Sequence, residues 1–174
     1  MPKKESKRLE IEKEVVKYPL IKEAYDYYAK KLGERYKKPK LKDLARLVFS
    51  DYLLLKKSKN WICKCVTCGN EMCRDDPSMH PGHYRKQWQS SFLKFKEENV
   101  YPQCKKCNVM MDGNYRNYYI FMLHTVGAER EFYLWTTKET IKYKSSDYAK
   151  MITSWRNALI QMNQVLNSHR LFPN

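Results

Sequence analysis

Residues 65–69 read CVTCG and residues 103–108 read QCKKCN, and these two stretches decide the fold of the central part of the chain. Each contains two cysteines separated by two residues, a spacing that places two thiolates on one side of a tight turn. Two such turns complete a tetrahedron of sulfur ligands. The sequence therefore predicts a structural Zn²⁺ that ties together the two ends of residues 69–103, with four ligands: Cys65, Cys68, Cys104 and Cys107.

Two of the six cysteines stay outside this set, namely Cys63 and Cys73. Cys63 and Cys65 have a CxC spacing, so a change of register at the first knuckle is an open alternative. We expect Cys63 to be a small buried side chain and Cys73 to be an ordinary thiol. No activating base accompanies either residue in the sequence, so a redox role is not indicated.

The charge of the chain indicates a polyanionic partner. Its 174 residues include 34 Lys and Arg against 19 Asp and Glu, a formal net charge of +15. This charge favours DNA, because each phosphate that a protein neutralises releases counterions. No apolar run of about 18 residues exists, and the first residues lack the apolar core of a signal peptide. The expectation is a cytoplasmic protein that does not enter a membrane.

Helical patterns surround the cysteine-rich part of the chain. Residues 9–38 predict a helix that Pro19 kinks or splits, and residues 41–57 predict an amphipathic helix whose apolar stripe is ordinary core. Residues 115–126 predict a helix that ends at Gly127, a residue suited to a C-cap.

The remaining C-terminal residues are less uniform. Residues 128–144 fit a helix or a hairpin, and residues 145–168 predict a final helix with Ser145 or Ser146 as its N-cap. The expected organisation has three parts: a basic helical segment at 1–58, a zinc-framed core at 59–127 and a helical extension at 128–174.

Two of the four histidines lie between the knuckles, where residues 79–87 read MHPGHYRKQ. A short strand ending at His83, a second strand from Asn99 and a helix starting near Cys107 would make a ββα unit with its ends tied by zinc. In this arrangement His83 projects towards the start of the helix, where Asn108 also points.

These motifs resemble the His-Me finger (HNH) endonuclease fold, through GHY at 82–84, Asn99 and CKKCN at 104–108. More closely, residues 41–127 are similar to the phage lambda NinG/Rap recombination proteins. The Asn that follows the last zinc cysteine also resembles a metal ligand of phage endonuclease VII, a junction resolvase. The resemblance implies an α+β fold, with a small zinc-framed ββα-metal core flanked by N- and C-terminal helices.

The resemblance implies a role for each candidate catalytic residue. His83 matches the general base, a task that suits an imidazole titrating near neutral pH. Asn108 matches a ligand of a catalytic Mg²⁺ or Mn²⁺, and Asn99 matches the residue that orients the histidine. Many members of the fold have an acidic ligand directly before the base, where this chain has Gly82. The HxGHY pattern implies that His80 supplies the second ligand instead.

A site of one imidazole and one carboxamide carries no negative charge and would favour Mn²⁺ or another transition metal over Mg²⁺. Asp75, Asp76 or Asp112 stays open as a further ligand. Asn114, in the sequence DGN, is either a capping residue or a weak site candidate.

Basic and aromatic residues next to the proposed base are candidates for DNA contact. Arg85 is nearest and would hold the scissile phosphate through two hydrogen bonds. Tyr84 or Trp88 would stack on an unpaired base, although the alternative for any single lysine is a solvated loop charge. The expected DNA-binding residues are Tyr84, Arg85, Lys86, Trp88, Lys105 and Lys106.

The resulting expectation is a metal-dependent endonuclease of a bacterial host or phage-infected cell that cuts branched DNA, leaving a 5′ phosphate and a 3′ hydroxyl. Branch specificity is implied by the resemblance alone. One alternative is an HNH nuclease that acts on linear or nicked duplex. Another is a zinc-framed DNA-binding recombination protein without catalysis. A homodimer is open, since a junction has twofold character.

Overall fold

The computed structural model describes residues 18–32 and 40–171 and divides the chain into two compact units. The first unit combines residues 1–52 with residues 143–174, and the second contains residues 53–142. These boundaries differ from those expected from the sequence, which follow residues 58 and 127. No helix of the described residues is both long and apolar enough to cross a lipid bilayer.

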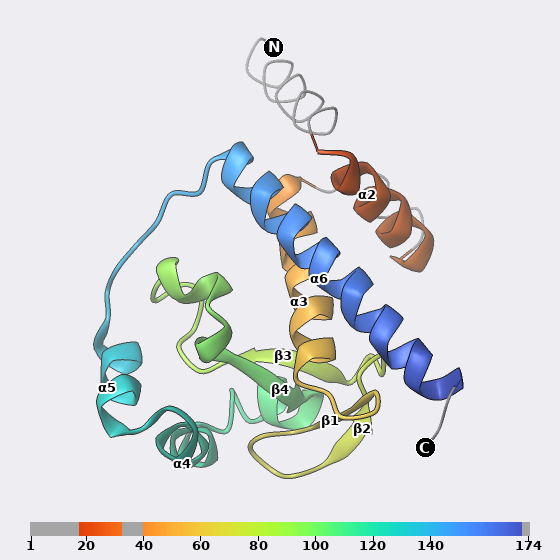
Figure 1. Ribbon diagram of the computed structural model, residues 1–174. Coiled ribbons are helices and arrows are strands. Elements are labelled where there is room, and N and C mark those ends of the chain that lie inside the picture. Colours follow the sequence, from red (N-terminus) through yellow and green to blue (C-terminus); the bar gives the residue numbers. More distant parts are fainter. Residues whose placement is uncertain (1–17, 33–39, 172–174) are drawn as a thin grey trace. The chain divides into compact units, whose positions relative to one another are not determined.

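Within the described residues, the first unit contains α2 (Pro19–Leu32), most of α3 (Leu41–Lys56) and α6 (Ser145–Leu171), which Figure 1 labels. Pro19 is the first residue of α2, a position that needs no backbone N–H donor. The helices predicted at 41–57 and from Ser145 are confirmed. Of the helix predicted at 9–38, residues 9–17 and 33–38 lie outside the described residues.

Side chains of these helices pack into one core. The Tyr28 hydroxyl of α2 donates to the Asp51 carboxylate of α3 at 2.7 Å, and the rings of Phe49 and Trp155 have centroids 4.9 Å apart. The apolar stripe expected on α3 is core as predicted, with its buried residues at Leu41, Leu44, Val48, Tyr52 and Leu55.

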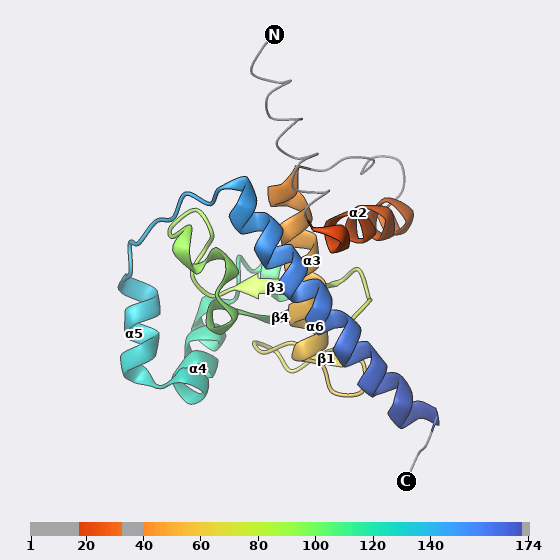
Figure 2. The same cartoon turned by 45° about the horizontal axis from the view of Figure 1, so that its top comes forward.

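The second unit contains two small antiparallel sheets. β1 (Ile62–Lys64) pairs with β2 (Glu71–Cys73), and β3 (Met79–His83) pairs with β4 (Val100–Cys104). The strand expected to end at His83 is confirmed, and β3 and β4 run side by side (Figure 2). The mixed α+β class is therefore confirmed at the level of small sheets combined with helices.

Helical turns join and follow the second sheet. Two short 3₁₀ turns, Phe92–Phe95 and Glu97–Asn99, precede β4. The helix expected near Cys107 is one π-helical turn, η4 (Lys106–Met110). It is followed by α4 (Tyr115–Val126) and α5 (Ala128–Thr136).

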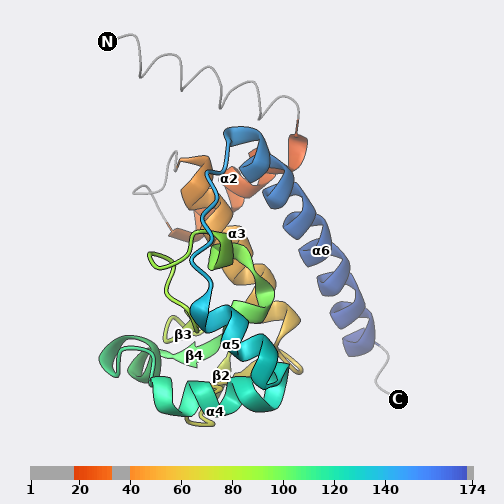
Figure 3. The ribbon, with the colours of Figure 1, turned by 90° about the vertical axis from the view of Figure 1, so that its left-hand side faces the viewer.

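α4 and α5 lie against each other, as Figure 3 shows. Gly127 separates them with φ of 82°, which confirms its expected place after the helix end. Residues 128–136, for which helix and hairpin were both open, are helical. The core beneath the helices contains Tyr84, Leu93, Tyr118, Met122 and Leu134.

Candidate functional site

The four knuckle cysteines meet as the sequence predicts. Their sulfur atoms all lie within 4.8 Å of one another. The first knuckle forms the turn between β1 and β2, and the second joins β4 to η4. Cys68 Sγ and Cys104 Sγ are 3.7 Å apart, and a tetrahedral zinc with Zn–S bonds of about 2.3 Å requires about 3.8 Å. The cluster therefore fits a structural zinc ion that has no open position for substrate.

Hydrogen bonds and burial have opposite effects on the ionisation of the cluster thiols. Burial opposes ionisation of the Cys65 thiol, but the Thr67 hydroxyl and backbone N–H groups outweigh it and lower the Cys65 pKa to about 6. Burial, together with the neighbouring thiols, raises the pKa of Cys68 to about 12. Four thiolates therefore require a cation among them. Asn114 donates to Cys107 Sγ at 3.6 Å from a left-handed backbone conformation, so this residue supports the knuckle.

Cys63 does not take part in a second register of the knuckle. Its thiol is buried and contacts the carbonyl oxygen of Leu54 at 3.3 Å. Burial raises the pKa of Cys63 to about 11, which keeps the thiol protonated at neutral pH. Cys73 is exposed on β2. The prediction that Cys63 is a small buried side chain is confirmed.

The structure fixes the tautomer of His83 at the end of β3. Its Nε2 lies 2.9 Å from the carbonyl oxygen of Lys94. A carbonyl oxygen only accepts, so Nε2 carries the proton of the neutral ring and Nδ1 carries the lone pair. The Gln87 amide donates to that nitrogen at 3.4 Å. His83 thus has the form that a general base needs.

Asn99 holds the loop that supplies this carbonyl. Its side chain is fully buried. The Oδ1 atom accepts from the Arg85 N–H at 2.8 Å, while Nδ2 donates to the carbonyl oxygens of Arg85 at 3.0 Å and Leu93 at 3.2 Å. Leu93 directly precedes Lys94, whose carbonyl orients His83. Asn99 therefore ties the segment after β3 to the turn before β4, and its role in orienting a catalytic histidine stays a prediction.

His80 and Asn108 are brought together from β3 and η4. The Asn108 amide donates to His80 Nδ1 at 3.1 Å, and His80 Nε2 lies 3.2 Å from the carbonyl oxygen of Pro77. His80 therefore also carries its proton on Nε2 and its lone pair on Nδ1. Asn108 of η4 therefore contacts the ring of His80, and the expectation that it also points where His83 projects stays a prediction.

Gly82 leaves no room for the acidic ligand found in many members of the fold. A Cβ atom on Gly82 would stand 2.1 Å from Gln103 Oε1. The Gln103 side chain is fully buried, and its Nε2 donates to the Gly113 carbonyl at 2.8 Å and to Thr67 Oγ1 at 3.2 Å. Gln103 thus links the strand of the histidines to the first knuckle. Sequence reasoning missed this residue, and the adjacent glycine is its only signal.

The three aspartates that stayed open as ligands have other partners. Both Asp112 oxygens accept from Lys86 Nζ, at 2.7 and 2.8 Å. Asp76 accepts from the Ser78 N–H at 2.7 Å, and Asp75 pairs with Arg74 at 3.3 Å. Across residues 18–32 and 40–171, the knuckle cysteines are the only close group of three or more His, Cys, Asp or Glu ligands.

The residues expected to contact DNA differ in their accessibility. Trp88 is 79% exposed, and the side chains of Lys105 and Lys106 are exposed at the second knuckle. Tyr84 is 1% exposed, because its ring packs on Tyr118. The expectation that Tyr84 stacks on DNA is therefore corrected.

Arg85 and Lys86 are partly buried and take part in ring contacts. The Arg85 guanidinium lies 5.1 Å from the centre of the Trp135 ring, and its Nε is buried without a hydrogen-bond partner. Lys86 pairs with Asp112 and lies 5.6 Å from the centre of the Tyr115 ring. Both cations are therefore anchored near the strand of the histidines.

Comparisons with known proteins identify the family. A family model described as "Bacteriophage Lambda NinG protein" matches residues 3–164. Protein NinG of Salmonella phage P22 is 26% identical over 95 residues, which are 50% of this chain and 45% of that protein. Protein NinG of Escherichia phage lambda is 26% identical over 102 residues, 54% and 48% of the two chains.

The same protein of Escherichia phage 933W is also 26% identical over 102 residues, 54% of this chain and 49% of its own. The chain spans about half the length of the relatives that it matches. No solved structure matches it. On the match over residues 3–164, the chain belongs to the NinG family of phage proteins.

Proposed function

We propose that this NinG-family chain is a metal-dependent DNA endonuclease of the His-Me finger (HNH) type. The observation that carries the proposal is that both histidines have the same tautomer, with the proton on Nε2. Each donates from Nε2 to a backbone carbonyl, at 3.2 Å for His80 and 2.9 Å for His83. Each therefore holds the Nδ1 lone pair away from that carbonyl, as a metal ligand and a general base require.

His83 is the general base of the proposed reaction. Its Nδ1 takes the proton of the attacking water, and the Nε2 hydrogen bond to Lys94 steadies the imidazolium that results. Oxygen from that water bonds to phosphorus while the bond to the 3′ oxygen breaks. The 3′ oxygen then takes up a proton, leaving a 5′ phosphate and a 3′ hydroxyl.

Two residues would hold the catalytic divalent ion, namely His80 and Asn108. They already meet at 3.1 Å, and a half-turn of the Asn108 amide presents its oxygen in place of its nitrogen. When bound, Mg²⁺ or Mn²⁺ supplies positive charge for the scissile phosphate. Because the pair includes an imidazole and no carboxylate, we expect Mn²⁺ to support higher activity than Mg²⁺.

Branched or recombining DNA is the proposed substrate, and two features support a nucleic-acid ligand. The chain has a net charge of +15, and exposed Trp88 follows the histidine strand with an accessible ring. The positive charge of the chain favours DNA of any structure as a partner. Branch specificity rests on the resemblance to recombination proteins. Cleavage of nicked or linear duplex is the alternative within the same chemistry.

Cleavage of end-labelled DNA tests the proposal. Four-way junction, flap, nicked duplex and linear duplex would each be incubated with zinc-loaded protein and Mg²⁺ or Mn²⁺. His83→Ala should bind DNA and keep its zinc but lose cleavage by at least a hundredfold, as expected for loss of a general base. His124→Ala is the matched control, since His124 is exposed in the last turn of α4.

Each result of this experiment has a distinct meaning. Loss of cleavage in His83→Ala but not in His124→Ala supports the assigned base. Cleavage of linear duplex alone keeps the chemistry and removes branch specificity. Binding without cleavage by the unmodified protein, with either metal, refutes the nuclease and leaves a zinc-framed DNA-binding protein.

A further inference from the structure

An aromatic groove lies between α4 and α5 in the second unit. Its volume is about 470 Å³, within the range of pockets that bind small ligands. Three large side chains on its lining are accessible to solvent, with Phe132 66%, Tyr119 45% and Trp135 42% exposed. Large contiguous patches of exposed apolar surface mark interaction sites on many proteins.

The floor of the groove is connected to the segment that directly follows the histidine strand. Tyr84, the residue after His83, lies on the lining and donates its hydroxyl proton to buried Glu131 of α5. Its ring centre is 5.7 Å from that of Trp135. The groove is therefore built on the element that carries the proposed base.

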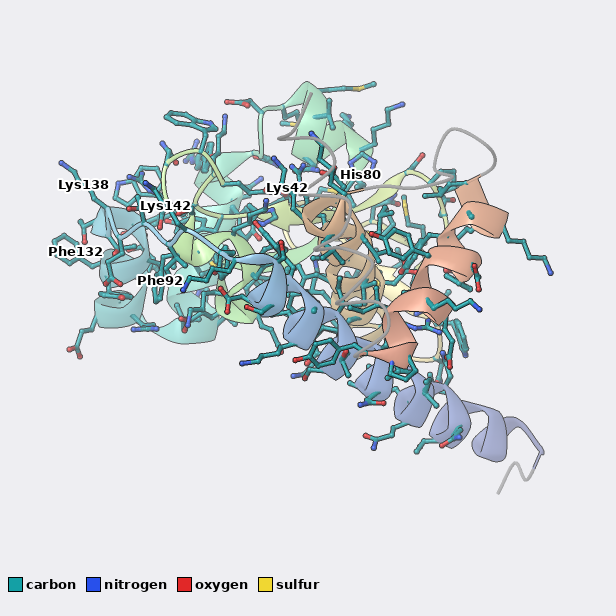
Figure 4. The ribbon with its side chains drawn as sticks, turned by 90° about the horizontal axis from the view of Figure 1, so that it is seen from above. Lys42, His80, Phe92, Phe132, Lys138 and Lys142 are labelled. Carbon is teal, nitrogen blue, oxygen red and sulfur yellow. The ribbon has the colours of Figure 1, made fainter. Side chains whose placement is uncertain are left out.

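Positive charge surrounds the rings. Arg116 lies on the lining and is exposed, and the Arg85 guanidinium sits 5.1 Å from the centre of the Trp135 ring. Lys138 and Lys142 are exposed and project on the same side as Phe132, whereas His80 lies on another part of the unit (Figure 4). Phosphates that flank a base in the groove would thus meet cations.

We propose that this groove binds an unpaired nucleobase of branched DNA, and the proposal rests on the nuclease function proposed above. A base can stack on the exposed rings of the groove, and the phosphates on either side of it can pair with the neighbouring Arg and Lys side chains. A base within a duplex has both faces covered by its neighbours, so only an unpaired one can offer a face to Phe132. The groove consequently distinguishes branched or gapped DNA from intact duplex.

The position of the groove defines which nucleotide it binds. His80 and Phe132 occupy different parts of the unit (Figure 4). We therefore expect the bound base to lie away from His80, one of the two residues proposed to hold the metal ion. Such a contact selects the structure of the substrate and takes no part in bond cleavage.

The charges decide against an apolar protein segment as the occupant. A peptide helix would cover Phe132 and Tyr119 but would bring no anions for Arg116, Lys138 or Lys142 to neutralise. DNA supplies the aromatic face and the anions together. A second copy of the chain, with its net charge of +15, would add repulsion at the groove.

Phe132→Ala tests the proposal, because a ring that is 66% exposed contributes little to folding. DNA with 2-aminopurine in a short gap would report stacking through quenched fluorescence, in zinc-loaded protein without added Mg²⁺ or Mn²⁺. Affinity for gapped DNA and for intact duplex would be measured by anisotropy. Ile120→Ala is the control, since Ile120 is 47% exposed on α4 but lies outside the groove lining.

The expected result is that Phe132→Ala loses quenching and binds gapped DNA about fivefold or more weakly. Its affinity for intact duplex should stay unchanged, as should both affinities of Ile120→Ala. Phe132→Tyr, which keeps a ring, should behave like the unmodified protein, whereas Phe132→Leu should behave like Phe132→Ala.

Three results would overturn the inference: unchanged binding of gapped DNA by Phe132→Ala, an equal loss for intact duplex, or a change in oligomeric state that assigns the groove to a second copy. Because no catalytic metal is added, the groove and the nuclease can fail separately. Quenching without cleavage under the earlier conditions would retain the groove and refute the nuclease. If Phe132→Ala cleaves DNA and keeps its affinity for gapped DNA, the nuclease is retained and the groove is refuted.

Discussion

Replacement of Gly82 by alanine should destabilise the second unit through a clash with one buried side chain. The new Cβ would stand 2.1 Å from Gln103 Oε1, 2.7 Å from Cδ and 2.8 Å from Cγ. Three consecutive atoms of the glutamine are therefore too close, and a small rotation of its amide does not relieve the contact. Because Gln103 is fully buried, its side chain has no solvent to move into.

The magnitude follows from the hydrogen bonds of Gln103. Its displacement breaks the bonds to the Gly113 carbonyl at 2.8 Å and to Thr67 Oγ1 at 3.2 Å. Buried polar groups left without partners cost about 1–3 kcal/mol each. The lower entropy of the unfolded alanine chain offsets about 0.4–1 kcal/mol. Two such groups cost about 2–6 kcal/mol before the offset, so we expect the free energy of unfolding to fall by about 1–6 kcal/mol.

A double-mutant cycle separates this clash from other effects of the substitution. In a Gln103→Ala background the space is open, so Gly82→Ala should keep only the unfolded-state effect and raise the unfolding free energy by about 0.4–1 kcal/mol. Urea unfolding of the zinc-saturated protein measures all four variants. The coupling between the two sites should equal the cost of the clash, about 2–6 kcal/mol. Equal effects of Gly82→Ala in both backgrounds would refute the reasoning.

Further perturbations address the buried asparagine, the metal and one lysine. Asn99→Ala should lower the free energy of unfolding by about 2–4 kcal/mol in urea, because it removes three buried hydrogen bonds, and an effect no larger than that of exposed Asn117→Ala would contradict this role. Cys68→Ser should reduce bound zinc and lower hydrogen-exchange protection across residues 53–142, which are tied by the cysteine cluster; full protection in zinc-free protein would count against a structural ion. Burial lowers the pKa of Lys57 from 10.5 to about 7, so the unfolded state binds more protons within this window and stability should rise with pH from 7 to 10.5. Lys57→Met should flatten that pH profile, and an unchanged slope would exclude Lys57 as its source.

The sequence by itself determined the features that depend on local spacing. Two CxxC motifs place their thiolates by the geometry of single turns, which is why the cluster of four sulfurs could be predicted without a fold. The strand ending at His83, the helix ending before Gly127 and the helix from Ser145 follow from short-range patterns of the same kind. Asn99 and the histidines were identified through motif resemblance, whereas the tautomers of the histidines and the loop contacts of Asn99 became visible only in the structure.

Only the tertiary structure decided which side chains meet or become buried. Asn108 contacts His80 because the pairing of β3 with β4 brings η4, which follows β4, beside the strand that carries His80. Tyr84 is buried because rings from helices more than 30 positions later cover it. Gln103 occupies the space beside Gly82 for a similar reason. Such contacts join residues that are distant in the chain, and their outcome depends on the packing of whole elements, which local sequence patterns do not encode.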